Sequence, residues 1–162
     1  MALALPIVAL IAGLAALPFL ASQPRPAPEL VMTTIGGEVT ALSSLRGQPV
    51  LVSFWSTSCG TCLTEMPALV ALHQRYGPQG LRTFAVAMSH DRLEQVTSFA
   101  RSRRLPFEIV LDETGAVARG FNDTQVTPTK FLIDGSGTIV RVYAGITDFA
   151  DLQRRIEGAL GG

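Results

Sequence analysis

The feature that most constrains the fold is a pair of cysteines between a strand-like and a helix-like segment. Cys59 and Cys62 are the only cysteines in the 162 residues. Ahead of them, residues 50–55 form an apolar run rich in β-branched and aromatic side chains, which predicts a buried strand. After them, residues 61–76 repeat apolar side chains at the spacing of an amphipathic helix. The cysteines are therefore expected at a strand-to-helix junction.

This position at the start of a helix points to redox chemistry. The first turn of a helix has unpaired backbone N–H groups and the positive end of the helix dipole, so the thiolate form of Cys59 is favoured. Such a thiolate can attack a disulfide. Cys62 lies one turn further on the same helix face, where it can attack the resulting mixed disulfide and release the partner. The chemistry needs no cofactor other than the Cys59–Cys62 disulfide itself.

Two other uses of a cysteine pair fit the sequence less well. A structural disulfide across so short a loop constrains little of the unfolded chain and would add little stability. Structural zinc normally has four ligands, and the sequence contains no second cysteine pair and no closely spaced histidine pair. The two histidines, His73 and His90, are separated by a predicted strand, and both are expected at the surface. We therefore predict no metal site.

The segments around the cysteines, together with a later motif, resemble the thioredoxin superfamily. The matching segments are the strand LVSFW, the pair CGTC, the acid and proline of CLTEMP, and the later VTPTKFLID. Within the superfamily they more closely resemble the extracytoplasmic TlpA/ResA/CcmG group of thiol-disulfide oxidoreductases, over about residues 29–160. Two positions depart from the family pattern. Ser58 stands where the family usually has Trp, and Thr61 stands where thioredoxin has Pro.

The resemblance implies roles for four further residues. Glu65, three positions after Cys62, matches the acid of the TlpA/ResA group and would be a buried proton shuttle, with burial favouring its neutral form. The alternative is an exposed glutamate held in the first turn by the helix dipole. Thr127 and Pro128 match a cis-proline turn that packs against the sulfurs and leaves the Thr127 backbone free to pair with an extended substrate. Trp55 is assigned to the same substrate-binding surface.

The predicted elements alternate between strands and helices and end in a hairpin and a closing helix. A short hairpin at residues 31–41, turning at Gly36 and Gly37, precedes them. Further strands are expected at 81–88, 107–111, 130–133 and 138–143, and further helices at 92–103, 116–121 and 149–160. This order predicts an α/β thioredoxin-like fold, with a central mixed β-sheet flanked by helices and an N-terminal β-hairpin extension.

The amino end of the chain is unlike the rest. Residues 3–21 carry no charged side chain and are about long enough to span a bilayer as a helix, so residues 1–22 are predicted to be a membrane anchor or signal peptide. A Pro-rich spacer at 23–28 separates them from the domain at 29–162. Phe19 interrupts the small-residue pattern of a cleavage site, which favours a retained anchor. The domain is then expected in the periplasm, on the extracytoplasmic face of the membrane.

The charge balance and the compartment limit which partners are expected. Thirteen basic residues balance thirteen acidic ones, so no nucleic-acid partner is expected. The expected substrates are proteins bearing disulfides. An exported dithiol that acts as a reductant is oxidised in each cycle and must be reduced again, so a membrane electron donor of the CcdA/DsbD type is also expected. We therefore predict a disulfide reductase for exported proteins, with cytochrome c maturation as one candidate setting.

Two alternatives to the reductase stay open at this point. The first is a Cu(I)-binding metallochaperone for an exported oxidase, because Sco-type copper proteins share the fold and two thiolates are soft ligands. Those proteins resemble a pattern with three residues between the cysteines and a downstream His. In this chain two residues separate Cys59 from Cys62, and no His lies near the VTPTKF motif. The second is a peroxidase, which has less support because peroxiredoxin-like sites need a single peroxidatic Cys in a different Pro/Thr context.

Overall fold

The structure, a computed structural model, describes residues 25–161. The predicted anchor at 1–22 and the first part of the spacer lie outside the described residues. Within residues 25–161, no helix is both long enough and apolar enough to cross a membrane.

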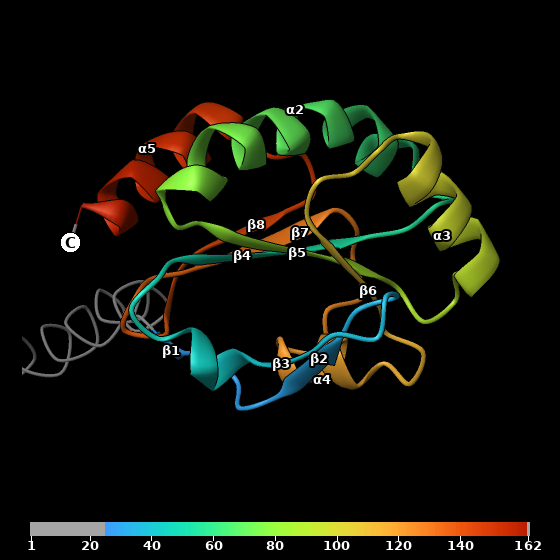
Figure 1. The fold of residues 1–162 in the computed structure, drawn as a ribbon, viewed down its shortest axis with the longest axis horizontal. Helices are drawn as coiled ribbons and strands as arrows, with labels where there is room; N and C mark the ends of the chain where they lie inside the picture. The colour runs from blue at the N-terminus through green and yellow to red at the C-terminus, as the bar shows by residue number, and fades with distance from the viewer. Residues whose placement is uncertain (1–24, 162) are drawn as a thin grey trace, which may run out of the picture.

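A six-stranded mixed sheet forms the centre of the domain, in the order β1-β8-β7-β4-β5-β6 (Figure 1). The middle and one side are parallel: β4 (Val50–Trp55), β5 (Arg82–Ala87) and β6 (Glu108–Leu111). The other side is antiparallel: β7 (Thr129–Ile133), β8 (Thr138–Ala144) and the two-residue β1 (Arg25–Pro26). Every residue of β4 is buried, as expected of a central strand covered on both faces.

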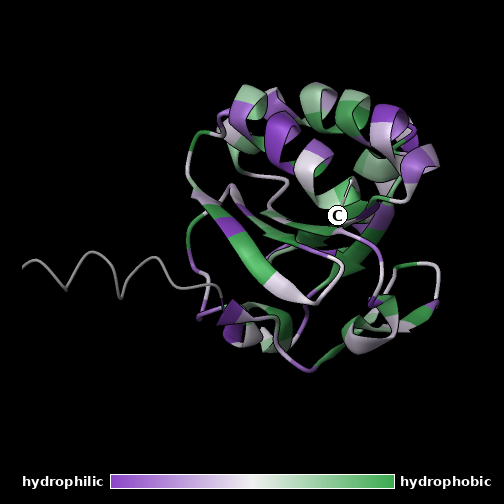
Figure 2. Cartoon of the chain, turned by 90° about the vertical axis from the view of Figure 1, so that its left-hand side faces the viewer, coloured by the Kyte–Doolittle hydropathy of each residue, from purple (hydrophilic) through white to green (hydrophobic). Residues whose placement is uncertain are grey.

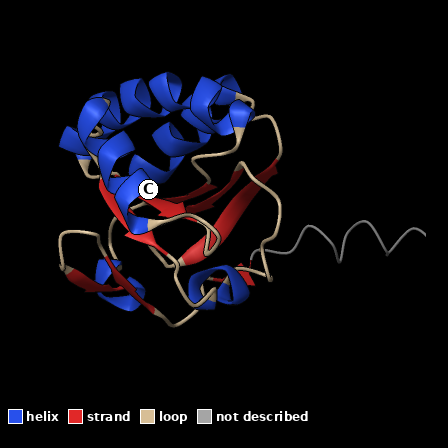
Figure 3. Ribbon diagram, turned by 90° about the vertical axis from the view of Figure 1, so that its right-hand side faces the viewer, coloured by secondary structure: helices blue, strands red, loops and turns tan. Residues whose placement is uncertain are grey.

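Helices and a hairpin cover the two faces of this sheet (Figures 1 and 3). One face carries α2 (Gly60–Tyr76), continued by the short η2 (Gly77–Gln79), with α3 (Leu93–Ser102) and α5 (Phe149–Leu160). The other face carries the antiparallel hairpin of β2 (Val31–Thr33) and β3 (Val39–Ala41), with η1 (Leu42–Leu45) and α4 (Ala116–Gly120). Each face has its own cluster of buried apolar side chains. Figure 2 shows the apolar strands between the layers and polar segments on the outer helices.

The thioredoxin-like fold predicted from the sequence is confirmed, including the N-terminal hairpin and the mixed sheet. Two local features differ from expectation. Arg25 and Pro26, placed in the spacer by composition, pair with β8 at the edge of the sheet, where a proline costs no ladder bond. His73 was expected at the surface, but its ring is partly buried and packs edge-on against Phe107 at 5.6 Å between centroids. His90 is exposed, as predicted.

Candidate active site

Cys59 and Cys62 form a disulfide at the start of α2, with their Cα atoms 5.2 Å apart. Cys59 is the residue that caps the helix, and its sulfur accepts a hydrogen bond from the backbone N–H of Cys62 at 3.2 Å. First-turn N–H groups have no partner within the helix, so a sulfur in this position is where a thiolate is stabilised. The strand-to-helix junction predicted from the sequence is therefore present, immediately after β4.

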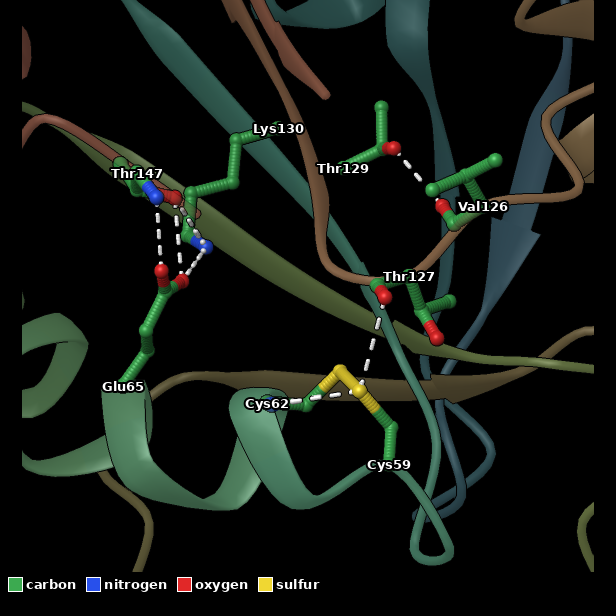
Figure 4. Close-up of polar contacts among 8 residues, drawn as sticks. All are labelled: Cys59, Cys62, Glu65, Val126, Thr127, Thr129, Lys130 and Thr147. Atoms are coloured by element: carbon green, nitrogen blue, oxygen red, sulfur yellow. Dashed lines mark hydrogen bonds and ion pairs between the residues drawn. A yellow bond between two sulfur atoms is a disulfide. The ribbon is translucent and has the colours of Figure 1, made fainter. Parts of the chain in front are cut away.

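The two sulfurs differ in exposure. Cys59 is partly exposed, whereas Cys62 is only 3% exposed. Cys59 Sγ also lies 3.6 Å from the carbonyl oxygen of Thr127, in the turn ahead of β7 (Figure 4). Of the two sulfurs, Cys59 is the one that a protein partner can reach.

The turn opposite the disulfide has the conformation that its motif predicted. The peptide bond between Thr127 and Pro128 is cis, and Pro128 is buried while Thr127 is partly exposed. Two hydrogen bonds hold the turn in place: the Gly145 N–H donates to the Pro128 carbonyl at 2.8 Å, and the Thr129 hydroxyl donates to the Val126 carbonyl at 2.7 Å. The Thr127 main chain is thereby fixed beside Cys59.

Glu65 lies one turn beyond Cys62 in α2, and its side chain is 10% exposed. Its Oε2 accepts hydrogen bonds from Lys130 Nζ at 2.6 Å and from the Thr147 hydroxyl at 3.0 Å (Figure 4). Its Oε1 accepts the Thr147 N–H at 2.7 Å. The structure thus places Glu65 in the interior, and not in the exposed first-turn position that was the alternative.

The cation that pairs with Glu65, Lys130, was not predicted from the sequence. The Lys130 side chain is 2% exposed, and its Nζ also donates to Thr147 Oγ1 at 2.9 Å and lies 5.5 Å from the centre of the Phe149 ring. Burial lowers the pKa of Lys130, while the hydrogen bond and the charge of Glu65 act in the opposite direction. One signal was available: Lys130 is the only lysine in the chain and stands within an apolar strand. Lysine is almost never fully buried unless it is paired.

A second buried carboxylate, Asp91, holds the loop that leads into Cys59. It accepts hydrogen bonds from Ser56 Oγ at 3.0 Å, from Thr57 Oγ1 at 2.6 Å and from the Thr57 N–H at 3.2 Å. The Ser56 hydroxyl lies in turn 2.9 Å from the Ser58 hydroxyl and 3.1 Å from His90 Nε2. These residues were also missed from the sequence, because Asp91 follows β5 and lies 35 positions from Ser56.

Trp55, which the sequence analysis assigned to the substrate-binding surface, is 2% exposed, and this assignment is corrected. Its ring packs against Phe99 of α3 with centroids 5.2 Å apart, within the core cluster that lies under α2. The reason is strand alternation: Trp55 shares the face of β4 that carries Leu51, and the helices cover that face. Trp55 therefore supports the site from beneath.

The arrangement as a whole is suited to dithiol-disulfide exchange. It combines an accessible sulfur at a helix start, a buried second sulfur one turn away, and a fixed main-chain segment beside the first. Within residues 25–161, no three His, Cys, Asp or Glu side chains gather where they could hold a metal ion.

Comparison with known proteins agrees with this chemistry. Residues 24–142 match the AhpC/TSA family. The thiol-disulfide oxidoreductase ResA of Geobacillus kaustophilus (strain HTA426) is 35% identical over 131 residues, which cover 81% of this chain and 74% of that protein. ResA of Bacillus subtilis (strain 168) is 32% identical over 124 residues, covering 76% of this chain and 68% of the relative.

Among solved structures, a thiol:disulfide interchange protein of the thioredoxin family from Chlorobium tepidum TLS is similar to this fold, with a TM-score of 0.77 and 28% identity. The match covers 86% of this chain and 98% of the other. Fold, cysteine spacing and relatives thus agree. The chain belongs to the AhpC/TSA family, as a thioredoxin-like thiol-disulfide oxidoreductase of the ResA type.

Proposed function

We propose that this protein is a disulfide reductase for exported proteins. The observation that carries the proposal is the unequal exposure of the two sulfurs, with Cys59 accessible beside the Thr127 main chain and Cys62 buried behind it. A sulfur that must meet a large substrate has to be accessible. A sulfur that acts only within the mixed disulfide does not.

The reaction starts from the reduced dithiol. The Cys59 thiolate attacks one sulfur of a substrate disulfide, and the other substrate sulfur leaves as a thiolate that takes up a proton from solvent. Cys62 then gives its proton to Glu65 and attacks Cys59 Sγ. The Cys59–Cys62 disulfide forms, the bond between Cys59 and the substrate sulfur breaks, and that sulfur leaves as a thiolate. Two electrons pass from the protein to the substrate, so the dithiol must be restored afterwards.

Substrate recognition is assigned to the turn at Thr127 and Pro128. The Thr127 main chain lies next to the attacking sulfur, and an extended substrate segment can pair with it as an added strand. Such pairing uses backbone groups, so it tolerates different substrate sequences. This suits an enzyme whose substrates share a disulfide and not a sequence.

Location and electron supply complete the proposal. The uncharged residues 3–21 support an N-terminal tether that holds the domain on the extracytoplasmic side of the membrane. Surroundings there oxidise dithiols, so a reductase needs a membrane partner that passes electrons from the cytosol, a donor of the CcdA/DsbD type. Apocytochrome c in cytochrome c maturation is one candidate substrate.

Trapping experiments test the assigned roles. The Cys62→Ser variant should accumulate mixed disulfides with its substrates through Cys59, because the resolving sulfur is missing. Cys59→Ser should accumulate few or none, since its remaining sulfur is buried. Non-reducing gels and mass spectrometry of the trapped species would count and name the substrates. Equal trapping by both variants would contradict the roles, and trapping by neither, with tight Cu(I) binding by the reduced wild type, would favour the copper carrier.

A further inference from the structure

The buried ammonium of Lys130 has no role in the reaction proposed above. It is enclosed between α2 and α5, with hydrogen bonds to Glu65 at 2.6 Å and to Thr147 at 2.9 Å. Taking two charges out of water is costly, and well-packed apolar residues of similar volume are often equally or more stabilising than a buried ion pair. Stability alone therefore does not account for a lysine in the apolar strand β7.

The contacts of Glu65 show what Lys130 does to it. Three hydrogen bonds converge on the carboxyl group, one from the ammonium and two from Thr147, and bonds of this kind favour the ionised carboxylate. A neutral acid would give up the charge-assisted bond from Lys130. The expectation from sequence, that burial favours neutral Glu65, did not include this partner.

A small cavity connects the pair to the redox centre. It has a volume of about 10 Å³, which is room for one water molecule. Its lining includes Cys62, Glu65, Lys130, Trp55 and Pro128. Cys62 and Glu65 thus line the same small cavity.

The other groups around Lys130 carry little charge. Among the described residues, Glu65 is the one charged group that acts on the Lys130 ammonium. Residues from the elements packed around the pair are neutral: Ser53 and Trp55 of β4, Thr147 ahead of α5 and Phe149 within it. Tyr143 of β8 lies opposite Lys130 in the sheet register, and its hydroxyl donates to Asp151 of α5 at 2.8 Å.

We propose that Lys130 is a positioning residue that keeps Glu65 ionised at the edge of this cavity, so that Glu65 can accept the proton of Cys62. The inference rests on the proposed reductase function and adds the residue that prepares its base. As the Cys62 S–H bond breaks, its proton passes to the Glu65 carboxylate, and the sulfur electron pair forms the bond to Cys59. The bond between Cys59 and the substrate sulfur breaks, and that sulfur leaves as a thiolate. Without Lys130, Glu65 loses the charge-assisted hydrogen bond that favours its ionised form.

The test uses an aromatic disulfide that releases a coloured thiolate. Reduced protein releases one thiolate when Cys59 attacks and a second when Cys62 resolves the mixed disulfide. Because the leaving group needs no proton, the pH dependence of the second release reports on deprotonation of Cys62. In Lys130→Met the acidic limb of this second phase should move up by at least about one pH unit relative to the wild type, measured between about pH 5 and pH 9. Lys130→Arg should restore most of the wild-type profile.

Arg82→Met is the matched control. Arg82 lies at the start of β5 and pairs with Glu108 of β6, at the end of the sheet opposite to the cysteines. This variant therefore also removes a cation from a strand, but at a site distant from the disulfide. It should leave the profile unchanged. Overlapping profiles for Lys130→Met and the wild type would overturn the inference, as would an equal shift in Arg82→Met.

A measurement on the unaltered protein covers the case in which Lys130→Met does not fold. The ¹³C resonance of the Glu65 carboxyl group in the reduced wild type should be that of a carboxylate at neutral pH, and a carboxylic acid resonance would overturn the inference. Failure of the proposed function has a different signature. The wild type would then reduce no protein disulfide, whereas failure of the inference alone leaves that activity intact.

Discussion

Two buried carboxylates stand on either side of the redox disulfide, and they are satisfied in different ways. Asp91 is 8% exposed, and its hydrogen bonds come from the neutral side chains and main chain of Ser56 and Thr57. Glu65 is similarly enclosed, but one of its donors is the ammonium of Lys130. Both groups therefore have partners, and what separates them is the charge of the partner.

The difference follows what each carboxylate does. Asp91 ties down the loop ahead of Cys59, and neutral donors are sufficient for a group that only fixes geometry. Glu65 lines the cavity next to Cys62, and in the proposed reaction it takes up the Cys62 proton, for which a neighbouring cation favours the ionised form of the acid. Asp91 thus fixes the geometry of the loop before Cys59, whereas Glu65 and Lys130 are proposed to act in proton transfer from Cys62.

The largest expected effect comes from breaking the charged pair. Glu65→Gln should lower the free energy of unfolding of the oxidised protein by about 3 kcal/mol at neutral pH, because the buried Lys130 ammonium loses its counter-charge. The pKa of Lys130 would then lie further below the 10.5 of an ordinary lysine, so the unfolded chain binds more protons than the folded one. The deficit should therefore shrink as pH rises toward about 10. Urea denaturation at two pH values measures this.

The double variant Glu65→Gln with Lys130→Met is the control for that experiment. It removes both charges and should recover most of the lost stability. A deficit that is the same at neutral and alkaline pH, or that persists in the double variant, would show that the unpaired ammonium is not its source.

A smaller loss of stability is expected when Asp91, the carboxylate with neutral donors, is substituted. Asp91→Asn should cost about 1–2 kcal/mol of stability, because the amide keeps one acceptor oxygen for Ser56 and Thr57 while its NH₂ group faces donors. The first thiolate release by Cys59 should slow as the loop loosens. The pH midpoint of the second release should stay in place, and a shifted midpoint would assign Asp91 to the proton path as well.

Asp112→Asn provides a matched control for Asp91. Asp112 is also buried, and it accepts backbone N–H groups from Val117 at 3.0 Å and Ala118 at 2.8 Å at the start of α4, away from the disulfide. A similar stability loss is expected there, with the first release unchanged. Stopped-flow traces of the two variants side by side distinguish a local effect on the loop from general destabilisation.

The smallest effect on stability is expected from two carboxylates of α5, Asp151 and Glu157, which accept hydrogen bonds from the hydroxyl groups of Tyr143 and Tyr76. Burial, aided by the bond to Asp151, raises the pKa of Tyr143 to about 12, and burial with the bond to Glu157 raises the pKa of Tyr76 as well. Since both folded values exceed the ordinary 10.0, this contribution to stability is complete below pH 10.0 and is lost as pH rises through the folded values.

Ultraviolet absorbance of the phenolates tests this. At about pH 11 the folded protein should show less phenolate than the chain in concentrated urea. Tyr143→Phe should remove the part of the transition near pH 12. Equal phenolate in folded and unfolded protein would contradict the hydrogen-bonded geometry of both tyrosines.

Local patterns in the sequence determined the frame of this protein. The apolar run at residues 50–55 became β4, the periodic run after it became α2, and the closing helix at 149–160 has the same bounds as α5. Strand and helix periods are properties of neighbouring residues, so they can be read without a fold. The same holds for Cys59 and Cys62, whose spacing puts them on one turn. The cis conformation at Pro128 followed from its motif and the resemblance that the motif carries.

Only the tertiary structure decided which distant residues complete the site. Lys130 meets Glu65 across 65 positions and Thr147 meets it across 82, while Asp91 meets Ser56 across 35. Trp55 was assigned to substrate binding, but the helices over its face of β4 bury it. These contacts depend on strand order, on register and on how helices lie over the sheet. A local pattern contains none of that information, because long-range packing brings the groups together.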